Sequence, residues 1–190
     1  MSFRLVTAPS EKVISIAEAK LHLRADSDNT EDALIDSLIV AATSWCEKYT
    51  NQCFVTQTWE LSLNEVCTSV VDLKAPLSSV TSINYTDTAG NPQLLDPSKY
   101  QVDLYSLPGN VLPAYGVTWP LVREGVGAFK VRFVAGFGAA ALVPDDIKCA
   151  IKLLVGHLYS NREAVTTFNA DEVPFGVRAL LSSYRIISIY

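Results

Sequence analysis

Residues 144–163, PDDIKCAIKLLVGHLYSNRE, decide the fold because they form the clearest amphipathic helix in the sequence. Apolar side chains recur there at the i, i+3, i+4 and i+7 spacing of one helix face. They are Ile147, Ala150, Ile151, Leu154, Val155, Leu158 and Tyr159. Pro144 suits the first helical position, where a missing N–H costs no hydrogen bond, and Asp145 and Asp146 favour the positive end of the helix dipole. The stretch therefore predicts a helix that begins at Pro144 and buries one face in a core.

One flank of this helix carries mostly small side chains, at Cys149, Leu153, Gly156 and Ser160. A glycine inside a helix costs roughly 1 kcal/mol relative to alanine, so its presence favours close contact with another helix or a neighbouring subunit. The alternative is a glycine that the helix simply tolerates.

Two further helices are predicted at the opposite end of the chain, after an extended leader over residues 3–13. The first, residues 15–25, opens with a capping box formed by Ser15 and Glu18. The second, residues 30–50, carries an apolar stripe at Leu34, Ile35, Leu38, Ile39, Ala42, Trp45 and Tyr49. Two helices cannot bury their own stripes, so we expect them to pack against the helix at 144–163. A short helix over 176–184 and an apolar tail, 186–190, close the chain.

Between these helices the hydrophobic period changes from 3.6 to 2. Residues 55–63 alternate apolar and polar side chains, with Gln57 as the one misfit. Turn signals rich in Pro, Gly and Asn separate further expected strands at 70–73, 80–86, 100–105, 110–113 and 129–134.

The order of helices, strands and helices predicts an α+β fold. We expect a helical core formed by the N- and C-terminal helices, with an inserted antiparallel β-sandwich or barrel-like region. The expected boundaries are 1–53 and 141–190 for the two helical parts of the core and 54–140 for the inserted β domain.

Composition excludes several classes of protein. The 190 residues carry a formal net charge of -5 with scattered Lys and Arg, which gives no global attraction for nucleic acid. Cysteines 46, 53, 67 and 149 form no C-x-x-C pair, which indicates buried free thiols rather than a zinc site or disulfides. No run approaches the roughly 18 apolar residues of a membrane span, and no signal-peptide pattern is present. A soluble protein without a standard export signal is expected.

The catalytic and ligand-binding patterns tested in the sequence fail. Residues 136–141 loosely fit a dinucleotide-binding motif, but the next helix starts too late. A calcium loop starting at Asp26 would have Glu31 where its glycine must stand. The two histidines, His22 and His157, lie on different predicted helices without a nucleophile elbow, zincin motif or Walker loop. We therefore predict no catalytic residue, no metal site and no cofactor.

Six segments stand out together because of their order and spacing along the chain. They are SIAEAKLHLR (15–24), VTQTWEL (55–61), PLSSVTSI (76–83), VLPAYGVTWP (111–120), VRFVAGFG (131–138) and LYSNREA (158–164). Together they closely resemble the head-tail connector (adaptor) family of tailed bacteriophages and prophages. The resemblance spans nearly the whole chain.

This resemblance implies a structural virion protein without enzymatic activity. Members of the family form a ring, usually of about twelve copies, between the portal at the capsid vertex and the tail. The implied partners are other copies of the chain, the portal protein, and tail or head-closure proteins. DNA is expected to pass through the channel without specific binding, and no membrane is involved. The implied location is the neck of the virion, with the host cytoplasm during assembly.

Three places are candidates for the portal or subunit interface. The C-terminal tail is apolar and rich in β-formers, so it either folds back on its own domain or docks on a neighbouring subunit or the portal. The loop 113–120 carries aromatics that suit a half-desolvated contact, although it serves equally well as a lid on its own sheet. The third place is the small-residue flank of the helix at 144–163. The candidate residues are Tyr184, Ile186, Ile187, Ile189, Tyr190, Tyr115, Trp119 and Gly156.

Two other classes of function stay open on the residues alone. A β-sandwich binding module for carbohydrate or a host surface, carried on a helical base, would show an exposed row of aromatics. A small enzyme at the junction of sheet and helices, with His157 among its few candidate groups, would show a deep apolar pocket with convergent polar side chains.

Overall fold

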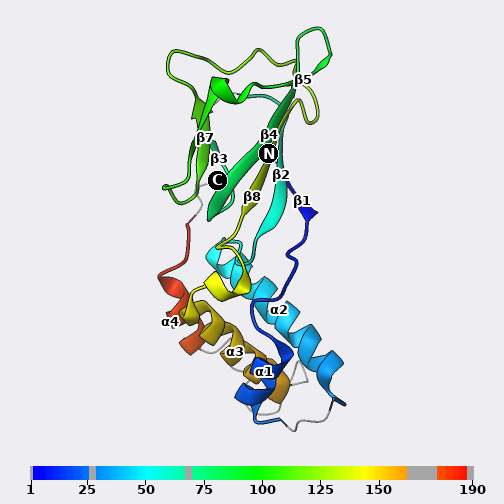
Figure 1. Ribbon diagram of the computed structural model, residues 1–190, viewed down its shortest axis with the longest axis vertical. Coiled ribbons are helices and arrows are strands. Elements are labelled where there is room, and N and C mark those ends of the chain that lie inside the picture. The colour runs from blue at the N-terminus through cyan, green and yellow to red at the C-terminus, as the bar shows by residue number, and fades with distance from the viewer. Residues whose placement is uncertain (1, 26–28, 67–69, 162–174, 188–190) are drawn as a thin grey trace. The chain divides into compact units, whose positions relative to one another are not determined.

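The computed structural model describes residues 2–25, 29–66, 70–161 and 175–187 (Figure 1). The chain divides into two compact units. The β unit comprises Met1–Ser10 and Val55–Phe137, and the helical unit comprises Glu11–Phe54 and Gly138–Tyr190. The fold is α+β, as the sequence predicts, with helices from both ends of the chain in one unit and strands from the middle, together with β1 from the N-terminal residues, in the other.

The helical unit is built around α3, which contacts each of the other α-helices (Figure 1). Its α-helices are α1 (Ile16–Leu23), α2 (Asp32–Thr50), α3 (Asp145–Ser160) and α4 (Phe175–Ser182), with a short 3-10 turn, η2 (Ala140–Leu142), before α3. The predicted stripe of α3 is buried at Ile147, Ala150, Ile151, Leu154 and Val155. It meets the buried face of α2, which consists of Ile35, Ile39, Ala42, Cys46 and Thr50. The predicted packing of N- and C-terminal helices is therefore confirmed.

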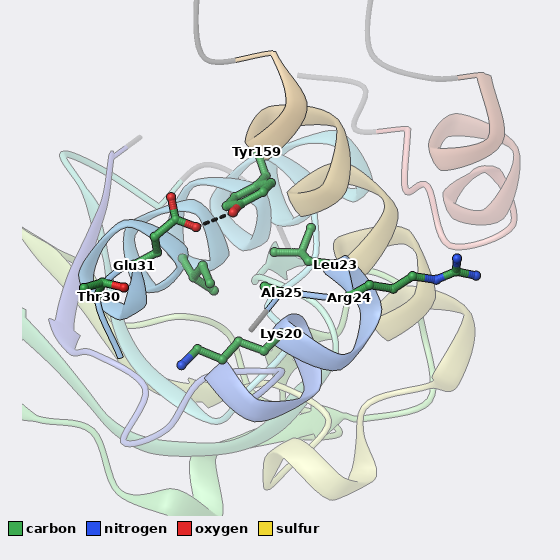
Figure 2. A pocket seen from close by; sticks show the side chains of 8 residues that line it. Lys20, Leu23, Arg24, Ala25, Thr30, Glu31 and Tyr159 are labelled. Carbon is green, nitrogen blue, oxygen red and sulfur yellow. Dashed lines mark hydrogen bonds between the residues drawn. The ribbon is translucent and has the colours of Figure 1, made fainter. Parts of the chain in front are cut away.

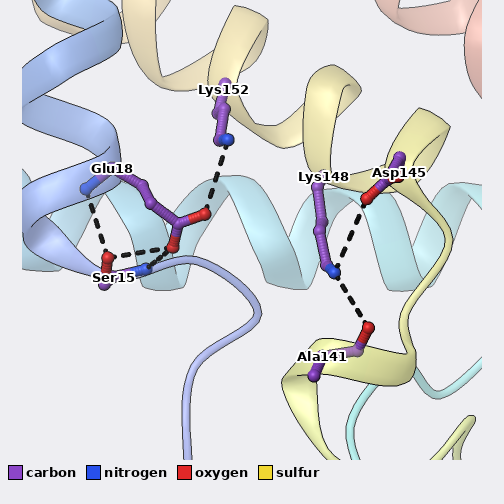
Figure 3. A network of polar contacts seen from close by, with 6 residues as sticks. All are labelled: Ser15, Glu18, Ala141, Asp145, Lys148 and Lys152. Atoms are coloured by element: carbon purple, nitrogen blue, oxygen red, sulfur yellow. Dashed lines mark hydrogen bonds and ion pairs between the residues drawn. The ribbon is translucent and has the colours of Figure 1, made fainter.

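The capping box at the start of α1 is confirmed and reaches α3 (Figure 3). The Glu18 backbone N–H donates to Ser15 Oγ over 3.2 Å, and the Ser15 backbone N–H donates to Glu18 Oε2 over 2.8 Å. The Ser15 hydroxyl also donates to Glu18 Oε2, over 2.9 Å. The bonds that the Ser15 backbone N–H and hydroxyl donate to the Glu18 carboxylate lower its pKa below the usual value, and the positive charge of Lys152 adds to the effect. Lys152 Nζ on α3 lies 3.5 Å from Glu18 Oε1. The first helix is thus both started and attached to α3 by the same carboxylate.

The β unit contains a five-stranded sheet and a three-stranded sheet, both antiparallel. The first has the order β1-β2-β8-β4-β5 and the second β3-β7-β6. The strands are β1 (Ser2–Thr7), β2 (Gln57–Leu63), β3 (Val71–Asp72), β4 (Leu77–Thr86), β5 (Pro92–Leu94), β6 (Tyr100–Asp103), β7 (Asn110–Pro113) and β8 (Phe129–Ala135), with a short 3-10 turn, η1 (Pro97–Lys99), before β6. Both sheets end in unpaired edge strands, so the region is sandwich-like and does not close into a barrel.

The predicted alternation is clearest in β8, where Phe129, Val131 and Phe133 are fully buried between exposed Lys130 and Arg132. Gln57, the misfit of the sequence pattern, lies buried at the start of β2. Its Oε1 accepts the indole N–H of Trp59 over 3.2 Å. A polar side chain is tolerated on this face because its oxygen is hydrogen-bonded.

Some elements differ from expectation. The leader is extended as predicted, but residues 2–7 also form a strand, β1, that pairs with β2, which the sequence did not indicate. The segment starting at Pro92 forms β5, although the sequence indicates only a turn there. Two helix starts are also shifted. Glu31, rather than Thr30, occupies the N-cap of α2 and makes no side-chain capping bond, and Pro144 is the N-cap of α3 rather than its first residue.

Candidate interaction surfaces

The root of the C-terminal tail is bonded to the end of α2. The Ile186 backbone N–H donates to the Thr50 carbonyl oxygen over 2.9 Å. The Gln52 side-chain amide donates to the Tyr184 carbonyl oxygen over 2.7 Å, and the Arg185 guanidinium lies 5.2 Å from the centre of the Tyr49 ring. The two hydrogen bonds satisfy the carbonyl oxygens of Thr50, at the end of α2, and of Tyr184.

The tail changes character directly after this anchor. Ile186 is half-buried, whereas Ile187 is 79% exposed. Ile189 and Tyr190, the other predicted tail contacts, lie outside the described residues. Of the tail candidates, Tyr184 and Ile186 therefore belong to the helical unit itself, and Ile187 is presented to solvent.

The loop after β7 separates its two aromatic candidates. Tyr115 is 99% exposed beside Gly116, whose positive φ of 73° makes the turn. Trp119 instead turns inward and makes an edge-to-face contact with Phe129, at 5.4 Å between ring centroids. The loop thus divides between the two roles predicted for it, since Trp119 covers the sheet and Tyr115 stays available.

Gly156 makes its close contact inside its own unit. A Cβ at this position would lie 3.6 Å from His22 Nε2 and 3.9 Å from a methyl carbon of Leu23, both on α1. These are ordinary van der Waals distances. The flank of α3 therefore admits α1, and this geometry gives no support to a role for Gly156 in contact with another subunit.

A pocket of about 450 Å³ opens in the helical unit (Figure 2). Its lining consists of Lys20, Leu23, Arg24, Ala25, Thr30, Glu31, Ile35 and Tyr159. The Tyr159 hydroxyl donates to the Glu31 carboxylate, Lys20 pairs with Asp32, and the Arg24 side chain extends away from Glu31 and Tyr159 in Figure 2. The Tyr159 and Glu31 side chains thus pair with each other, and Lys20 pairs with Asp32 beside the pocket.

Other candidate chemistry can be placed residue by residue. Among the described residues, no three His, Cys, Asp or Glu side chains lie close enough to hold a metal ion, and no helix is long and apolar enough to cross a membrane. Cys46 and Cys53 are buried thiols as predicted, and burial raises the pKa of Cys46 to about 12, with a smaller contribution from the negative charge of Glu47. Cys149 is exposed, which corrects the prediction of a buried thiol, because it lies on the solvent side of α3. Cys67 lies outside the described residues.

One exposed apolar loop was missed by sequence reasoning. Residues 104–109, between β6 and β7, expose Leu104, Tyr105 and Leu107 to solvent. Tyr105 and Tyr115 lie on the loops that precede and follow β7, so they do not form the aromatic row expected of a carbohydrate-binding sheet. The sequence signal was Asp103 itself, since an aspartate side chain can accept the backbone N–H groups two and three residues further on and so favours a turn.

The β unit has open sheet edges and exposed apolar side chains, and the helical unit exposes Ile187. Such surfaces are typical of a protein that binds other proteins. The chain belongs to the head completion protein family, whose model matches residues 12–187.

Three solved structures are similar over the whole chain. One is the neck of an empty GTA particle computed with C6 symmetry, whose matching chain is 25% identical with a TM-score of 0.83. A chain in the virion of the native gene transfer agent (GTA) particle is 26% identical with a TM-score of 0.82. A chain in the neck of the native particle computed with C12 symmetry is 26% identical with a TM-score of 0.78. Each match covers 100% of this chain and 98% of the other. No curated protein matches the sequence.

Family and fold agree with the resemblance drawn from the sequence. The chain is a structural virion protein, a connector of the head-tail neck. Head completion is a structural role and not a class of enzyme.

Proposed function

We propose that this chain forms a closed ring of about twelve copies that joins the portal to the tail and leaves a channel for DNA. The observation that carries the proposal is the end-to-end match, at 26% identity, to a chain in a neck computed with C12 symmetry. A ring requires each copy to contact its neighbours through two different surfaces, because a self-complementary surface closes a dimer instead. Exposed Ile187 in the helical unit and the exposed loops of the β unit offer two different surfaces of this kind.

The tail from Ile187 onward is the segment that docks on a neighbouring subunit or on the portal. The preceding residue, Ile186, is bonded to Thr50 of α2, while Ile187 itself has most of its surface in water. An apolar terminal segment of β-formers is suited to adding a strand to another sheet. Tail or head-closure proteins are the partners on the opposite side of the ring.

Charge supports passage of DNA rather than binding. The chain has a formal net charge of -5, and a ring of such copies repels a phosphate backbone over the range that salt leaves unscreened. DNA passes through a channel without being retained when the protein does not bind its phosphate backbone.

The proposal is tested by removing the gene and restoring it in trans. Without the protein, heads should accumulate without tails and lose packaged DNA, and the wild-type copy should restore tailed, filled particles. Electron microscopy and nuclease protection of the packaged DNA measure both effects. Filled and tailed particles at the normal yield without this protein would contradict the connector role.

A further inference from the structure

The loop of residues 104–109, which joins β6 to β7, displays three large apolar side chains within four positions. Leu104 is 48% exposed, Tyr105 98% and Leu107 59%. Single exposed apolar residues are common on soluble proteins, but a cluster on one short loop marks a contact surface. Tyrosine is also one of the side chains that most often carry the energy of a protein interface.

Asp103 holds this loop in one conformation. Its Oδ1 accepts the backbone N–H groups of Tyr105 over 2.8 Å and of Ser106 over 3.1 Å. Its Oδ2 accepts the Ser106 hydroxyl over 2.6 Å. One carboxylate therefore fixes the backbone at the point where Tyr105 projects.

The other end of the loop is fixed by packing. The Leu73 backbone N–H donates to the Gly109 carbonyl oxygen over 2.8 Å. A Cβ on Gly109 would lie 2.4 Å from the Cβ of Leu77, so this position has no room for a side chain. A loop that is ordered before it binds loses less conformational entropy on binding, which favours a docking function.

The loop lies at the start of the longest uncharged stretch of the sequence. Residues 104–122 contain no Asp, Glu, Lys or Arg. Each copy of the chain carries a net charge of -5, so copies repel one another where their charged surfaces face. Contact between two copies is least opposed where the contacting segment is neutral. A second copy is therefore the partner that the charge of the chain favours for this loop.

We propose that the loop 104–107 of each copy inserts into an apolar, uncharged surface of the next copy in the ring. This inference rests on the ring assembly proposed above and names one of its lateral contacts. The contact joins two different surfaces, as ring closure requires, with Tyr105 at its centre and Asp103 as the residue that positions the loop.

The first test compares two double variants in particles assembled in cells. Tyr105→Ser with Leu107→Ser removes the apolar side chains of the loop. Leu94→Ser with Val126→Ser is the matched control elsewhere in the β unit. Leu94 is 67% exposed, close to the value for Leu107, and Val126 is 99% exposed, close to the value for Tyr105. We expect both proteins to keep the wild-type melting temperature, and the loop variant to reduce the yield of tailed particles at least tenfold while the control does not. Wild-type yield with the loop variant would overturn the proposal.

The second test separates the side chains from the conformation of the loop. Asp103→Ala keeps every apolar side chain but removes the acceptor, and Asp103→Asn keeps one acceptor oxygen. We expect a several-fold loss of tailed particles for Asp103→Ala and partial recovery for Asp103→Asn. Equal, wild-type yields for both would show that positioning by Asp103 is not needed.

The third test identifies the partner directly. A photo-crosslinking amino acid at position 105 is activated in assembled particles that carry the full-length protein, and the adduct is identified by mass spectrometry. A covalent pair of two copies of this chain is expected, whereas an adduct to a different neck protein would overturn the choice of partner. A ring that is present in the neck while the loop gives no copy-to-copy adduct refutes only this inference; absence of the ring from wild-type particles refutes the proposed function.

Discussion

The backbone N–H of Ile186 donates a 2.9 Å hydrogen bond to the carbonyl oxygen of Thr50, the last residue of α2. The tail is therefore bonded to the helical unit at Ile186, whereas the next residue, Ile187, is 79% exposed. The hydrogen bond at Ile186 lies one peptide bond before the segment that we propose docks on other proteins, so truncation can separate the two roles.

Truncation at two points should have two different effects. A stop after Ile186 removes residues 187–190 and should leave the melting temperature unchanged while preventing attachment to portal-containing capsids. A stop after Ser183 also removes the bonds to Thr50 and Gln52, and should lower the free energy of unfolding by about 1–3 kcal/mol. Thermal melts and a capsid-binding assay measure the pair. Normal capsid attachment after the stop at Ile186 would refute the docking role of the tail.

The core of the helical unit should not accept charge on the inner face of α3. Leu154 is 3% exposed, and Leu154→Asp should lower the free energy of unfolding by about 3–5 kcal/mol because the carboxylate is buried without a partner. The adjacent Leu153 is 37% exposed, so Leu153→Asp is the matched control and should melt close to wild type. Urea denaturation of both variants gives the comparison. Equal stability of the two would mean that the inner face of α3 is assigned wrongly.

The Asp103 carboxylate, which clamps the loop 104–109 through its hydrogen bonds to Tyr105 and Ser106, should titrate below its ordinary pH range. Hydrogen bonds from the Ser106 hydroxyl and from the Tyr105 and Ser106 backbone lower the pKa of Asp103 below the ordinary 3.8. A lowered pKa in the folded state means that the clamp contributes at pH values above 3.8 and is lost as the pH falls through the folded-state pKa. The amide chemical shift of Tyr105, followed by NMR, should change with a midpoint below 3.8, and this transition should vanish in Asp103→Asn. A midpoint at or above 3.8 would show that the hydrogen bonds do not hold the carboxylate.

Thiol reactivity should distinguish the buried Cys46 from the exposed Cys149 in the helical unit. Burial raises the pKa of Cys46 to about 12, so almost no reactive thiolate forms at pH 8. Cys149 is exposed on α3 and accessible to reagent. Peptide mapping after iodoacetamide treatment should find Cys149 modified in the folded protein and Cys46 modified only after unfolding. Rapid modification of Cys46 under native conditions would indicate that its surroundings open frequently.

The elements that were predictable from sequence are those whose burial is periodic. The stripe of α3 and the alternation of β8 both follow from one buried face, which imposes a period of 3.6 or 2 on the residues. Strand β1 has no such period because it is an edge strand with most of its residues exposed, so pairing with β2, rather than burial, makes it a strand. Its register could not be found without knowing its partner.

The candidate sites were less predictable because they depend on contacts between distant residues. The bond between Gln52 and Tyr184 joins positions 132 residues apart, and nothing near Tyr184 indicates it. The small residue Gly156 predicts close approach of another helix or of a neighbouring subunit, without indicating which of the two approaches. In the structure the neighbour is His22 of α1.

We propose that the β unit is an insertion into a helical domain that folds without it. The helices of the helical unit contact one another. Glu11 Oε1 also accepts the Ala140 backbone N–H over 2.7 Å, which joins the N-terminal and C-terminal parts of this unit. A chain that starts at residue 11 and replaces 55–137 with a short flexible linker should keep a helical far-ultraviolet circular dichroism spectrum. A spectrum without helix would show that the strands are required for the core to form.

The most direct test of the central claim is a cryo-electron microscopy reconstruction of the neck of assembled particles, calculated without imposed symmetry. We predict one closed ring of about twelve copies of this chain between the portal and the tail, with the segment after Ile186 leaving each helical unit to contact a neighbouring copy or the portal. A neck that lacks this chain, or holds it as isolated copies without lateral contact, would contradict the account.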